Sequence, residues 1–254
     1  MPLYSHSKLS TFENCPLKYK YKYIDRLPAE IKQTIEGHLG KVVHDTLQWI
    51  YSQVKSKIII SIDEIVGYYA EKWRENYSED TLIVRTGFTE EDYFNIGIEF
   101  LAEYYREHSP FEDGTLECEK QIMIKLDEEG RYKIWGFIDR LVYNLETGEY
   151  EVHDYKTANT LPNKEDIDND RQLALYAIAV KEIFGYDKEV RLIWHYLAHN
   201  KKIDSKRTNE QLEKLKQETL NLIEKIESAQ VFPHNKSALC DWCEFRPSCE
   251  AWRR

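Results

Sequence analysis

The stretch from Gly136 to Lys156 constrains the fold more than any other part of the chain. Residues 134–143 are rich in Ile, Phe, Val, Trp and Tyr, which favours a β-strand. Residues 146–149 are polar with one glycine, which is typical of a short hairpin turn. Residues 151–155 then alternate polar and apolar side chains, as a second strand would. The sequence therefore predicts a β-hairpin here.

Three of the charged side chains on this predicted hairpin would lie together. Pairing of the strands would bring Asp139 and Asp154 close together, and Lys156 lies two residues beyond Asp154, on the same face of its strand. Two carboxylates and an ammonium that face one spot are costly without a partner, and a hard divalent cation would relieve that cost. A lone D-x-K pattern also occurs by chance at solvated strand ends. The hairpin is therefore a candidate cation site, with Lys156 left to meet a substrate anion.

Apolar periodicity predicts the elements around this hairpin. Helices are expected over residues 37–51, most of 58–108, 171–180 and 210–226. Strands are expected over residues 116–126 and 190–197, with a turn at 127–130. The order of helices, three strands, helix, strand and helix predicts a mixed α/β fold whose first strands are consecutive hairpins.

Five further polar residues each have two interpretations. Glu117 or Glu119 would reach the carboxylate site from the preceding strand, although a solvated strand face is the commoner reason for such residues. His44 follows an apolar helical stripe, where a histidine is more often a core residue than a ligand. Gln172 and Tyr176 are four residues apart and share one helix face, where Tyr176 has packing as its simplest role.

Composition bounds the class of protein. The chain has 254 residues, 42% hydrophobic and 31% charged, which predicts a folded globular protein of one large domain or two small ones. No apolar run approaches the roughly 18 residues of a membrane helix, and residues 1–10 lack the apolar core of a signal peptide, so we expect a cytoplasmic location without membrane contact. The net charge of −10 argues against indiscriminate coating of nucleic acid, but it leaves room for a local basic groove.

The N-terminal region offers one candidate for such a groove. Cationic and aromatic residues alternate there, namely Lys18, Tyr19, Lys20, Tyr21, Lys22 and Tyr23. A solvated helix anchored by its tyrosines explains this pattern most simply. A patch that contacts phosphates and bases is the functional alternative.

The cysteines indicate a metal or cluster site. The chain has five, an odd number that is poor evidence for disulfides. Cys240, Cys243 and Cys249 crowd into ten residues, and a tetrahedral metal or an iron–sulfur cluster requires four ligands. Cys15 is the best candidate for the fourth ligand, whereas Cys118 lies in a predicted strand and suits a small core residue. Spacing alone does not separate zinc from an iron–sulfur cluster, and free buried thiols remain the alternative.

Six short motifs, taken together in chain order, resemble the RecB-type branch of the PD-(D/E)XK nuclease superfamily. The likeness is closest to members with an iron–sulfur cluster, such as the AddB nuclease domain and the CRISPR-associated exonucleases of the fourth family. The motifs are Cys15-Pro16, Gly40 to His44, Gly136 to Asp139, Asp154 to Lys156, Gln172 to Tyr176 and Cys240 to Cys249. One position departs from the superfamily's name, because Ile138 precedes Asp139 where a proline is implied, a variation that RecB-type members commonly show.

The resemblance implies a fold and its parts. We expect one nuclease domain over residues 1–254, with a restriction-endonuclease-like core in which helices flank a central mixed sheet, and with a helical N-terminal region. A helical insertion would occupy about 41–110 and the catalytic sheet core 116–198. The cluster-binding tail would occupy 239–252 and pair with Cys15.

The resemblance also implies roles for the residues. The metal ligands for Mg²⁺ or Mn²⁺ would be His44, Asp139, Asp154 and the backbone carbonyl of Tyr155. Lys156 would position or activate the attacking water and stabilise charge on phosphorus, so Asp139, Asp154 and Lys156 form the expected catalytic set. Gln172 and Tyr176 would bind DNA or support the site. A [4Fe–4S] cluster is expected on Cys15, Cys240, Cys243 and Cys249, with zinc as the alternative.

The implied activity is hydrolysis of DNA phosphodiester bonds, by an exonuclease acting on single-stranded or frayed DNA. DNA repair, recombination or CRISPR adaptation would be its setting, with a separate helicase or CRISPR adaptation proteins as partners. The alternative is a catalytically silent DNA-binding module that keeps the fold and a structural iron–sulfur or zinc site.

Overall fold

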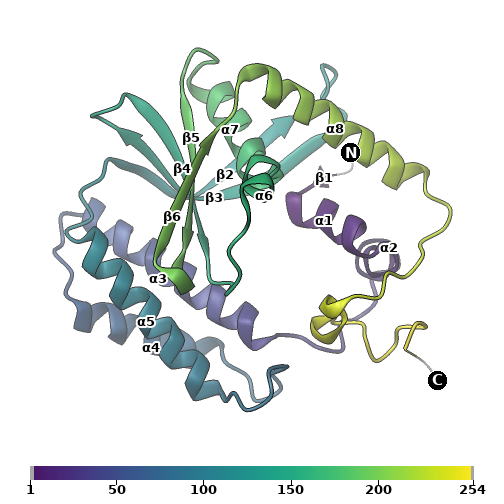
Figure 1. Cartoon of the computed structure of the whole chain (residues 1–254), viewed down its shortest axis with the longest axis horizontal. Coiled ribbons are helices and arrows are strands. Elements are labelled where there is room, and N and C mark those ends of the chain that lie inside the picture. The colour runs from purple at the N-terminus through teal and green to yellow at the C-terminus, as the bar shows by residue number, and fades with distance from the viewer. Residues whose placement is uncertain (1–2, 253–254) are drawn as a thin grey trace.

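A computed structural model of the chain describes residues 3–252 and is built around a mixed, six-stranded sheet (Figure 1). The strands are β1 (Leu3–Tyr4), β2 (Thr115–Lys125), β3 (Lys133–Asn144), β4 (Glu149–Lys156), β5 (Val190–Tyr196) and β6 (Lys201–Lys206). β2, β3 and β4 pair antiparallel in series, β4 pairs parallel with β5, and β5 pairs antiparallel with β6. The prediction of a mixed α/β fold with a central mixed sheet is therefore confirmed.

Helices cover both faces of the sheet (Figure 1). The α-helices are α1 (His6–Asn14), α2 (Pro16–Tyr19), α3 (Ile35–Lys55), α4 (Ile62–Asn76), α5 (Glu90–His108), α6 (Lys164–Asp168), α7 (Arg171–Phe184) and α8 (Asn209–Ser228). A π-helical turn η1 (Lys20–Ile24) and the 3₁₀ turns η2 (Leu197–His199) and η3 (Ala238–Trp242) complete the list. α7 packs on the sheet with α8 behind it, whereas α3, backed by α4 and α5, packs near the opposite face.

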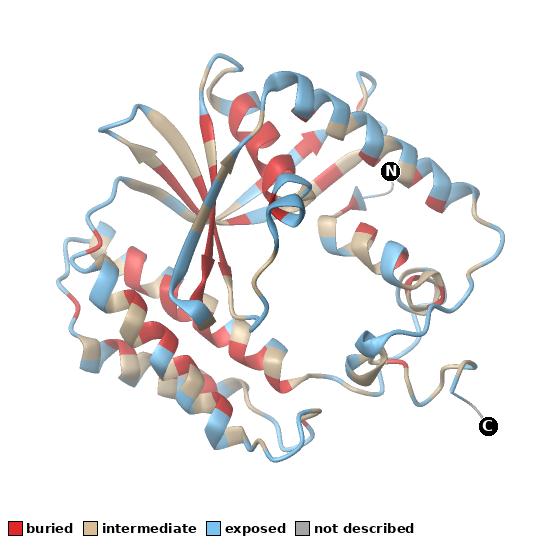
Figure 2. Cartoon of the chain, in the orientation of Figure 1, coloured by how far each residue is buried: buried red, intermediate tan, exposed pale blue. Residues whose placement is uncertain are grey.

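Each helical layer has its own apolar core, visible as two buried bands in Figure 2. The first core lies between the sheet and α7, and includes Ile138, Leu173 and Trp194. The second lies among α3, α4 and α5, and includes Leu47 and Trp73. All five side chains are buried. Burial of apolar surface at these two places is what fixes the helices relative to the sheet.

Side-chain caps explain where several helices begin. α4 and α5 start with capping boxes, in which Ser61 pairs with Glu64 and Thr89 with Asp92. α7 starts at Asp170, whose side chain accepts the backbone N–H of Leu173. This cap satisfies a donor at the helix end that lies next to the candidate site, so it also fixes the position of that end.

The sequence interpretation omitted three elements. The edge strand β6 reads Lys-Lys-Ile-Asp-Ser-Lys and has no buried residue, so it lacks the apolar alternation by which strands are recognised. β1 has two residues, and α6 forms one short turn within a polar segment. Among the helices that the structure describes, none has the length and apolarity needed to cross a bilayer.

A gap in strand pairing prepares the functional site. β4 pairs with β3 only between Arg140 and Asn144, and β1 pairs with the opposite end of the same edge, at Lys133 and Ile134. Residues 135–139 of β3 consequently have no partner strand on this edge within residues 3–252. Backbone and side chains at such a fork are available for other contacts.

Candidate active site and the cysteine-lined cavity

The candidate site lies where β3 and β4 diverge. Their pairing ends at Arg140 and His153, so Asp139 and Asp154 are the next residues of each strand on the open side. Asp139 Oδ2 accepts a hydrogen bond from the backbone N–H of Tyr155 at 3.0 Å. The carboxylate thus replaces the missing ladder partner, which holds it at the fork.

Lys156 connects this fork to α7. Its Nζ lies 2.7 Å from Asp154 Oδ2 and donates to Gln172 Oε1 at 3.1 Å. Gln172 Nε2 in turn donates to the Tyr176 hydroxyl at 3.4 Å. Asp154 is 3% exposed, whereas the Lys156 side chain is 31% exposed, so the ammonium lies between the buried carboxylate and solvent.

His44 reaches the same place from α3. Its Nδ1 lies 3.3 Å from Asp139 Oδ2, and its Nε2 donates to the Tyr155 carbonyl at 2.8 Å, since a carbonyl only accepts. Of the residues that the resemblance assigned to a metal, the structure brings His44, Asp139 and the Tyr155 carbonyl together. Asp154 lies at the next strand position and pairs with Lys156, and it is outside the group whose ligand atoms lie within 4.8 Å of one another.

Burial and neighbouring charges shift the pKa values of Asp139 and Lys156. The pKa of Asp139 is raised to about 7 by burial and then by the negative charge of Asp154, with His44 acting in the opposite direction. Burial alone would lower the pKa of Lys156, but the neighbouring carboxylates of Asp154, Asp170 and Asp139 together outweigh it and the net shift is upward. Lys156 therefore stays cationic at neutral pH and compensates the charge of Asp154, whereas Asp139 has His44 as its nearest basic partner.

Glu119 joins the site, although the sequence favoured a solvated strand face for it. Ligand atoms of His44, Glu119 and Asp139 all lie within 4.8 Å of one another. Glu119 has φ of 48°, a left-handed conformation that residues other than glycine seldom adopt. Burial raises the pKa of its carboxyl group. The signal that would have found it is the register of the β2–β3 hairpin, which places Glu119 across from Asp139.

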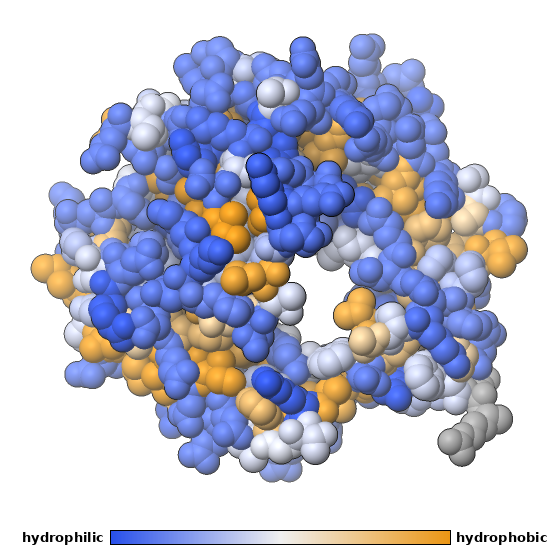
Figure 3. Space-filling model, viewed as in Figure 1, coloured by the Kyte–Doolittle hydropathy of each residue, from blue (hydrophilic) through white to orange (hydrophobic). Residues whose placement is uncertain are grey.

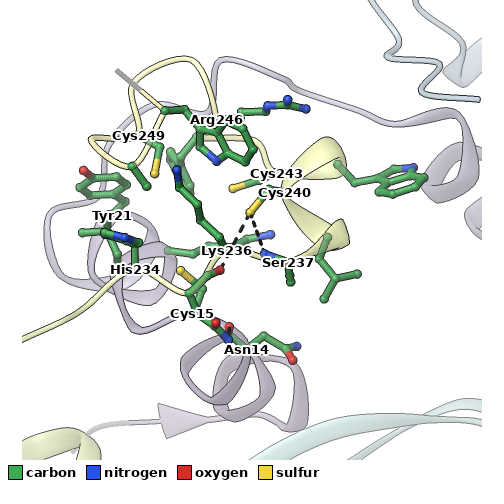
Figure 4. Close-up of a pocket in the computed structure, with 18 of the residues that line it drawn as sticks. Asn14, Cys15, Tyr21, His234, Lys236, Ser237, Cys240, Cys243, Arg246 and Cys249 are labelled. Atoms are coloured by element: carbon green, nitrogen blue, oxygen red, sulfur yellow. Dashed lines mark hydrogen bonds between the residues drawn. The ribbon is translucent and has the colours of Figure 1, made fainter. Parts of the chain in front are cut away.

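The four cysteines expected to act together line one cavity of about 190 Å³ at the junction of the two chain ends. Figure 4 shows the side chains of Cys15, Cys240, Cys243 and Cys249 around this space. The fifth, Cys118, lies on β2 against the second apolar core, where burial raises the pKa of its thiol to about 11. A protonated thiol is a poor metal ligand, so the structure separates Cys118 from the other four.

Polar contacts also join the two chain ends. Leu17 N–H donates to the Pro233 carbonyl at 3.2 Å, and Asn235 donates to the Asn14 carbonyl at 3.0 Å. Glu244 receives ion pairs from Lys18 at 2.6 Å and Lys22 at 2.9 Å. These ties bring residues more than 200 positions apart in the sequence into contact.

The structure agrees with the simpler of the two interpretations of the basic N-terminal segment. Lys20 pairs with Asp25 at 2.6 Å, and Lys18 and Lys22 are both engaged by Glu244. Tyr19 is buried against Phe12, with ring centroids 5.4 Å apart. The segment is therefore a tyrosine-anchored helix in which Lys18 and Lys22 bind the C-terminal tail, and these three lysines do not form a free cationic patch.

Comparison with known proteins places this geometry in context. A sequence model of the PD-(D/E)XK nuclease superfamily matches residues 4–250. The chain is 26% identical over 239 residues to one of the subunits of the ATP-dependent helicase/deoxyribonuclease of Carboxydothermus hydrogenoformans, a match that covers 84% of this chain but 22% of that protein's length. The crystal structure of a "Putative exonuclease" from Eubacterium rectale has a similar fold, with a TM-score of 0.50 and 14% identity, covering 94% of this chain and 86% of that one.

Proposed function

The chain belongs to the PD-(D/E)XK nuclease superfamily, and from that premise we propose that it is a metal-dependent deoxyribonuclease that hydrolyses DNA phosphodiester bonds. One observation carries the proposal: His44, Asp139, Asp154, Lys156 and the Tyr155 carbonyl converge at the fork of β3 and β4. The carboxylates can bind a metal cation, and the ammonium beside them can contact an anionic substrate that reacts next to that cation.

The donor set fits Mg²⁺ or Mn²⁺. Carboxylate and carbonyl oxygens are the ligands that hard divalent cations prefer, and one imidazole nitrogen suits Mn²⁺ as well. The raised pKa of Asp139 supports this fit, because a cation would offset both its burial and its repulsion by Asp154. His44, Asp139, Asp154 and the Tyr155 carbonyl would hold the ion, which supplies Lewis acidity and lowers the pKa of a bound water.

Lys156 would carry the charge that meets the phosphate. Asp154 and Gln172 hold its Nζ in place before substrate arrives. A preorganised ammonium stabilises developing negative charge without a reorganisation cost at the moment of reaction. The Gln172–Tyr176 hydrogen bond orients Gln172, so this pair would support the site from α7.

We also propose that Cys15, Cys240, Cys243 and Cys249 bind an iron–sulfur cluster. Among residues 3–252, one group of histidine, cysteine and acidic side chains has ligand atoms within 4.8 Å of one another, and it is the His44 group. The thiols are therefore spaced more widely than in a four-cysteine zinc site, where sulfurs about 2.3 Å from one ion lie about 3.8 Å apart. The cavity of about 190 Å³ that the four thiols line leaves room for a cluster, with a single zinc ion as the alternative. A bound cluster would staple the chain ends, which already share hydrogen bonds.

An opening through the molecule supports action on single strands. Figure 3 shows it between the sheet core, the start of α3 and the cysteine-rich end, as located by comparison with Figure 1. We propose that a single-stranded or frayed DNA end enters here, so that the enzyme acts as an exonuclease. The curated relative is named as part of a helicase/deoxyribonuclease. On that basis a separate helicase would be the partner, in DNA repair or recombination, with CRISPR adaptation as the other setting.

Cleavage of end-labelled DNA tests the proposal. Linear single-stranded DNA should be degraded with Mg²⁺ or Mn²⁺, and chelation with EDTA should stop the reaction. Circular single-stranded DNA of the same sequence should resist, because an exonuclease requires an end. If no divalent cation supports cleavage of linear, circular or forked DNA, the chain is a silent DNA-binding module instead. Cutting of the circle at the rate of the linear strand would overturn exonuclease action alone.

A further inference from the structure

One face of the β2–β3 pair carries a row of side chains that the proposed chemistry leaves unused. Three cross-strand pairs form this row, here called the β2–β3 strip. In register they are Gln121 opposite Phe137, Met123 opposite Trp135, and Lys125 opposite Lys133. The intervening residues Ile122 and Ile124 are buried in the first core, so the strip occupies the other face of the sheet.

The strip continues directly from the proposed metal site. Glu119 and Asp139, whose ligand atoms lie beside His44 of α3, are each two residues along their strands from Gln121 and Phe137. A DNA strand whose scissile phosphate lies at Asp139 would therefore meet Phe137 next. Each step along the strip is about 6.6–6.8 Å, twice the rise per residue.

The middle of the strip is apolar and open to solvent. Met123 is 52% exposed and Phe137 is 39% exposed. The rings of Trp135 and Phe137 meet edge to face, with centroids 5.6 Å apart and an interplanar angle of 82°. Single exposed apolar residues are ordinary on protein surfaces. Three apolar side chains in adjoining positions beside a candidate active site form a platform on which flat rings can stack.

The far end of the strip is cationic. Lys125 and Lys133 are directly opposite each other across the two strands. In the part of the chain that the structure describes, neither forms an ion pair, in contrast to Lys18 and Lys22. Like charges in opposed cross-strand positions repel. An anion placed between these ammonium groups would remove that repulsion.

We infer that the β2–β3 strip binds single-stranded DNA beside the scissile phosphate. Unpaired bases would stack on Phe137, Trp135 and Met123, and backbone phosphates would contact Lys125 and Lys133. Stacking on aromatic side chains requires bases that are not paired, and alternating aromatic and cationic contacts are the usual means of holding a single strand without sequence preference. The inference rests on the proposed nuclease function and names the surface that holds its single-stranded substrate.

Substitution of Phe137 separates stacking from general packing. Binding of a fluorescent oligothymidylate in EDTA, where no cleavage occurs, should weaken about tenfold in Phe137→Ala. Phe137→Trp should keep the parent affinity, whereas Phe137→Leu should behave like Phe137→Ala. Leu145→Ala is the matched control, since Leu145 is 83% exposed just beyond the other end of β3. Parent affinity in Phe137→Ala, or full affinity in Phe137→Leu, would overturn the stacking role.

The salt dependence of DNA binding tests the proposed phosphate contacts of Lys125 and Lys133. Lys125→Gln and Lys133→Gln should each reduce the slope of log affinity against log salt by about 0.7–1. An unchanged slope in both variants would show that phosphates do not reach this end of the strip.

A substrate without bases distinguishes failure of the strip from failure of the nuclease proposal. Parent protein and Phe137→Ala should hydrolyse bis(p-nitrophenyl) phosphate at equal rates, while Phe137→Ala should raise KM for single-stranded DNA with little change in kcat. If the parent hydrolyses neither substrate, the nuclease proposal fails. If Phe137→Ala slows both substrates equally, Phe137 supports the site itself and the strip inference is wrong.

Discussion

The Arg140 guanidinium donates a hydrogen bond of 2.9 Å to the Tyr155 hydroxyl, immediately behind the candidate active site. The backbone carbonyl of the same residue, Tyr155, accepts a hydrogen bond from His44. Arg140 is 1% exposed, also donates to His153 Nδ1 at 2.8 Å, and lies 4.2 Å from the centroid of the Tyr51 ring on α3. One buried cation therefore joins β3, β4 and α3 at the last paired residues before the strands separate.

Loss of Arg140 is expected to destabilise the fold strongly. Arg140→Ala would leave Tyr155, His153 and Asp113 without this hydrogen-bonding partner. Removal of one member of a buried ionic network typically lowers the free energy of unfolding by about 3–5 kcal/mol. Denaturant unfolding followed by circular dichroism measures this. Arg131→Ala is the control, because Arg131 pairs with Asp127 and Glu129 at the surface and its loss should change little. Equal effects of the two substitutions would contradict the structural role of Arg140.

Two histidines near Arg140 predict acid sensitivity. The pKa values of His153 and His195 lie well below the ordinary value, first because of burial and then because of neighbouring cationic or histidine groups. In the unfolded chain each takes up a proton near pH 6.5, whereas the folded protein resists it. Stability should therefore fall as pH drops below about 6.5, by up to about 1.4 kcal/mol per pH unit for each histidine.

Thermal unfolding between pH 7 and pH 5, with metal chelated, checks this slope. His195→Gln should flatten the dependence of the melting temperature on pH, whatever its effect at pH 7. The exposed His199→Gln should leave the slope as in the parent. A parent slope retained in His195→Gln would assign acid sensitivity to other groups.

The sequence predicted the site better than it predicted what surrounds it. The motif residues were recognisable because each motif is short and its spacing is local. The structure also explains why one motif contains glycine: a Cβ on Gly136 would lie 2.9 Å from the Tyr176 ring, so the glycine of one motif makes room for the tyrosine of another. Arg140 and Glu119 gave no such signal. Their importance comes from contacts across strands and between layers, which no periodicity in a single segment reveals.

The fold was also predictable in part. Buried strands and amphipathic helices are recognisable by the spacing of their apolar residues, whereas the polar edge strand β6 is not. The role of the N-terminal lysines could not be predicted from local spacing. Only the fold brings Glu244 to Lys18 and Lys22, so the sequence left open whether they face DNA or protein.

The cysteine cavity predicts a difference between two substitutions. Cys243→Ser removes a proposed cluster ligand, so protein purified without oxygen should lose its brown colour and iron, and should unfold at a lower temperature because ligation is coupled to folding. Cys118→Ser is the control, because Cys118 lies outside the cavity and should leave iron content unchanged. Iron and zinc analysis together with melting temperature provide the measurement. Stoichiometric zinc without iron in the parent would refute the cluster and keep the four-ligand site.

Glu119 is expected to take part in metal binding. Glu119→Gln keeps the shape of the side chain but removes a charge beside His44 and Asp139, so Mn²⁺ should bind more weakly in a calorimetric titration. The neighbouring Glu117→Gln is the control, since Glu117 pairs with Lys120 at the surface. Mn²⁺ affinity equal to the parent in Glu119→Gln would leave the left-handed conformation of Glu119 without a role in the site.

The division of labour between Asp154 and Lys156 gives the sharpest test of the chemistry. Asp154→Ala removes a proposed metal ligand, so both Mn²⁺ affinity and DNA cleavage should collapse. Lys156→Ala leaves the ligands in place and removes a cation 2.7 Å from Asp154, so Mn²⁺ should bind at least as tightly as in the parent. Cleavage by Lys156→Ala should nevertheless fall by about 10²–10³, the usual effect of losing one preorganised charge at a developing oxyanion. His44→Ala should weaken Mn²⁺ binding less than Asp154→Ala, because the carboxylate pair remains. Calorimetric titration and cleavage rates on the same preparations provide the measurement. Normal cleavage by Lys156→Ala would contradict the role of Lys156 in the reaction, and parent-like Mn²⁺ binding by Asp154→Ala would contradict the role of Asp154 as a metal ligand.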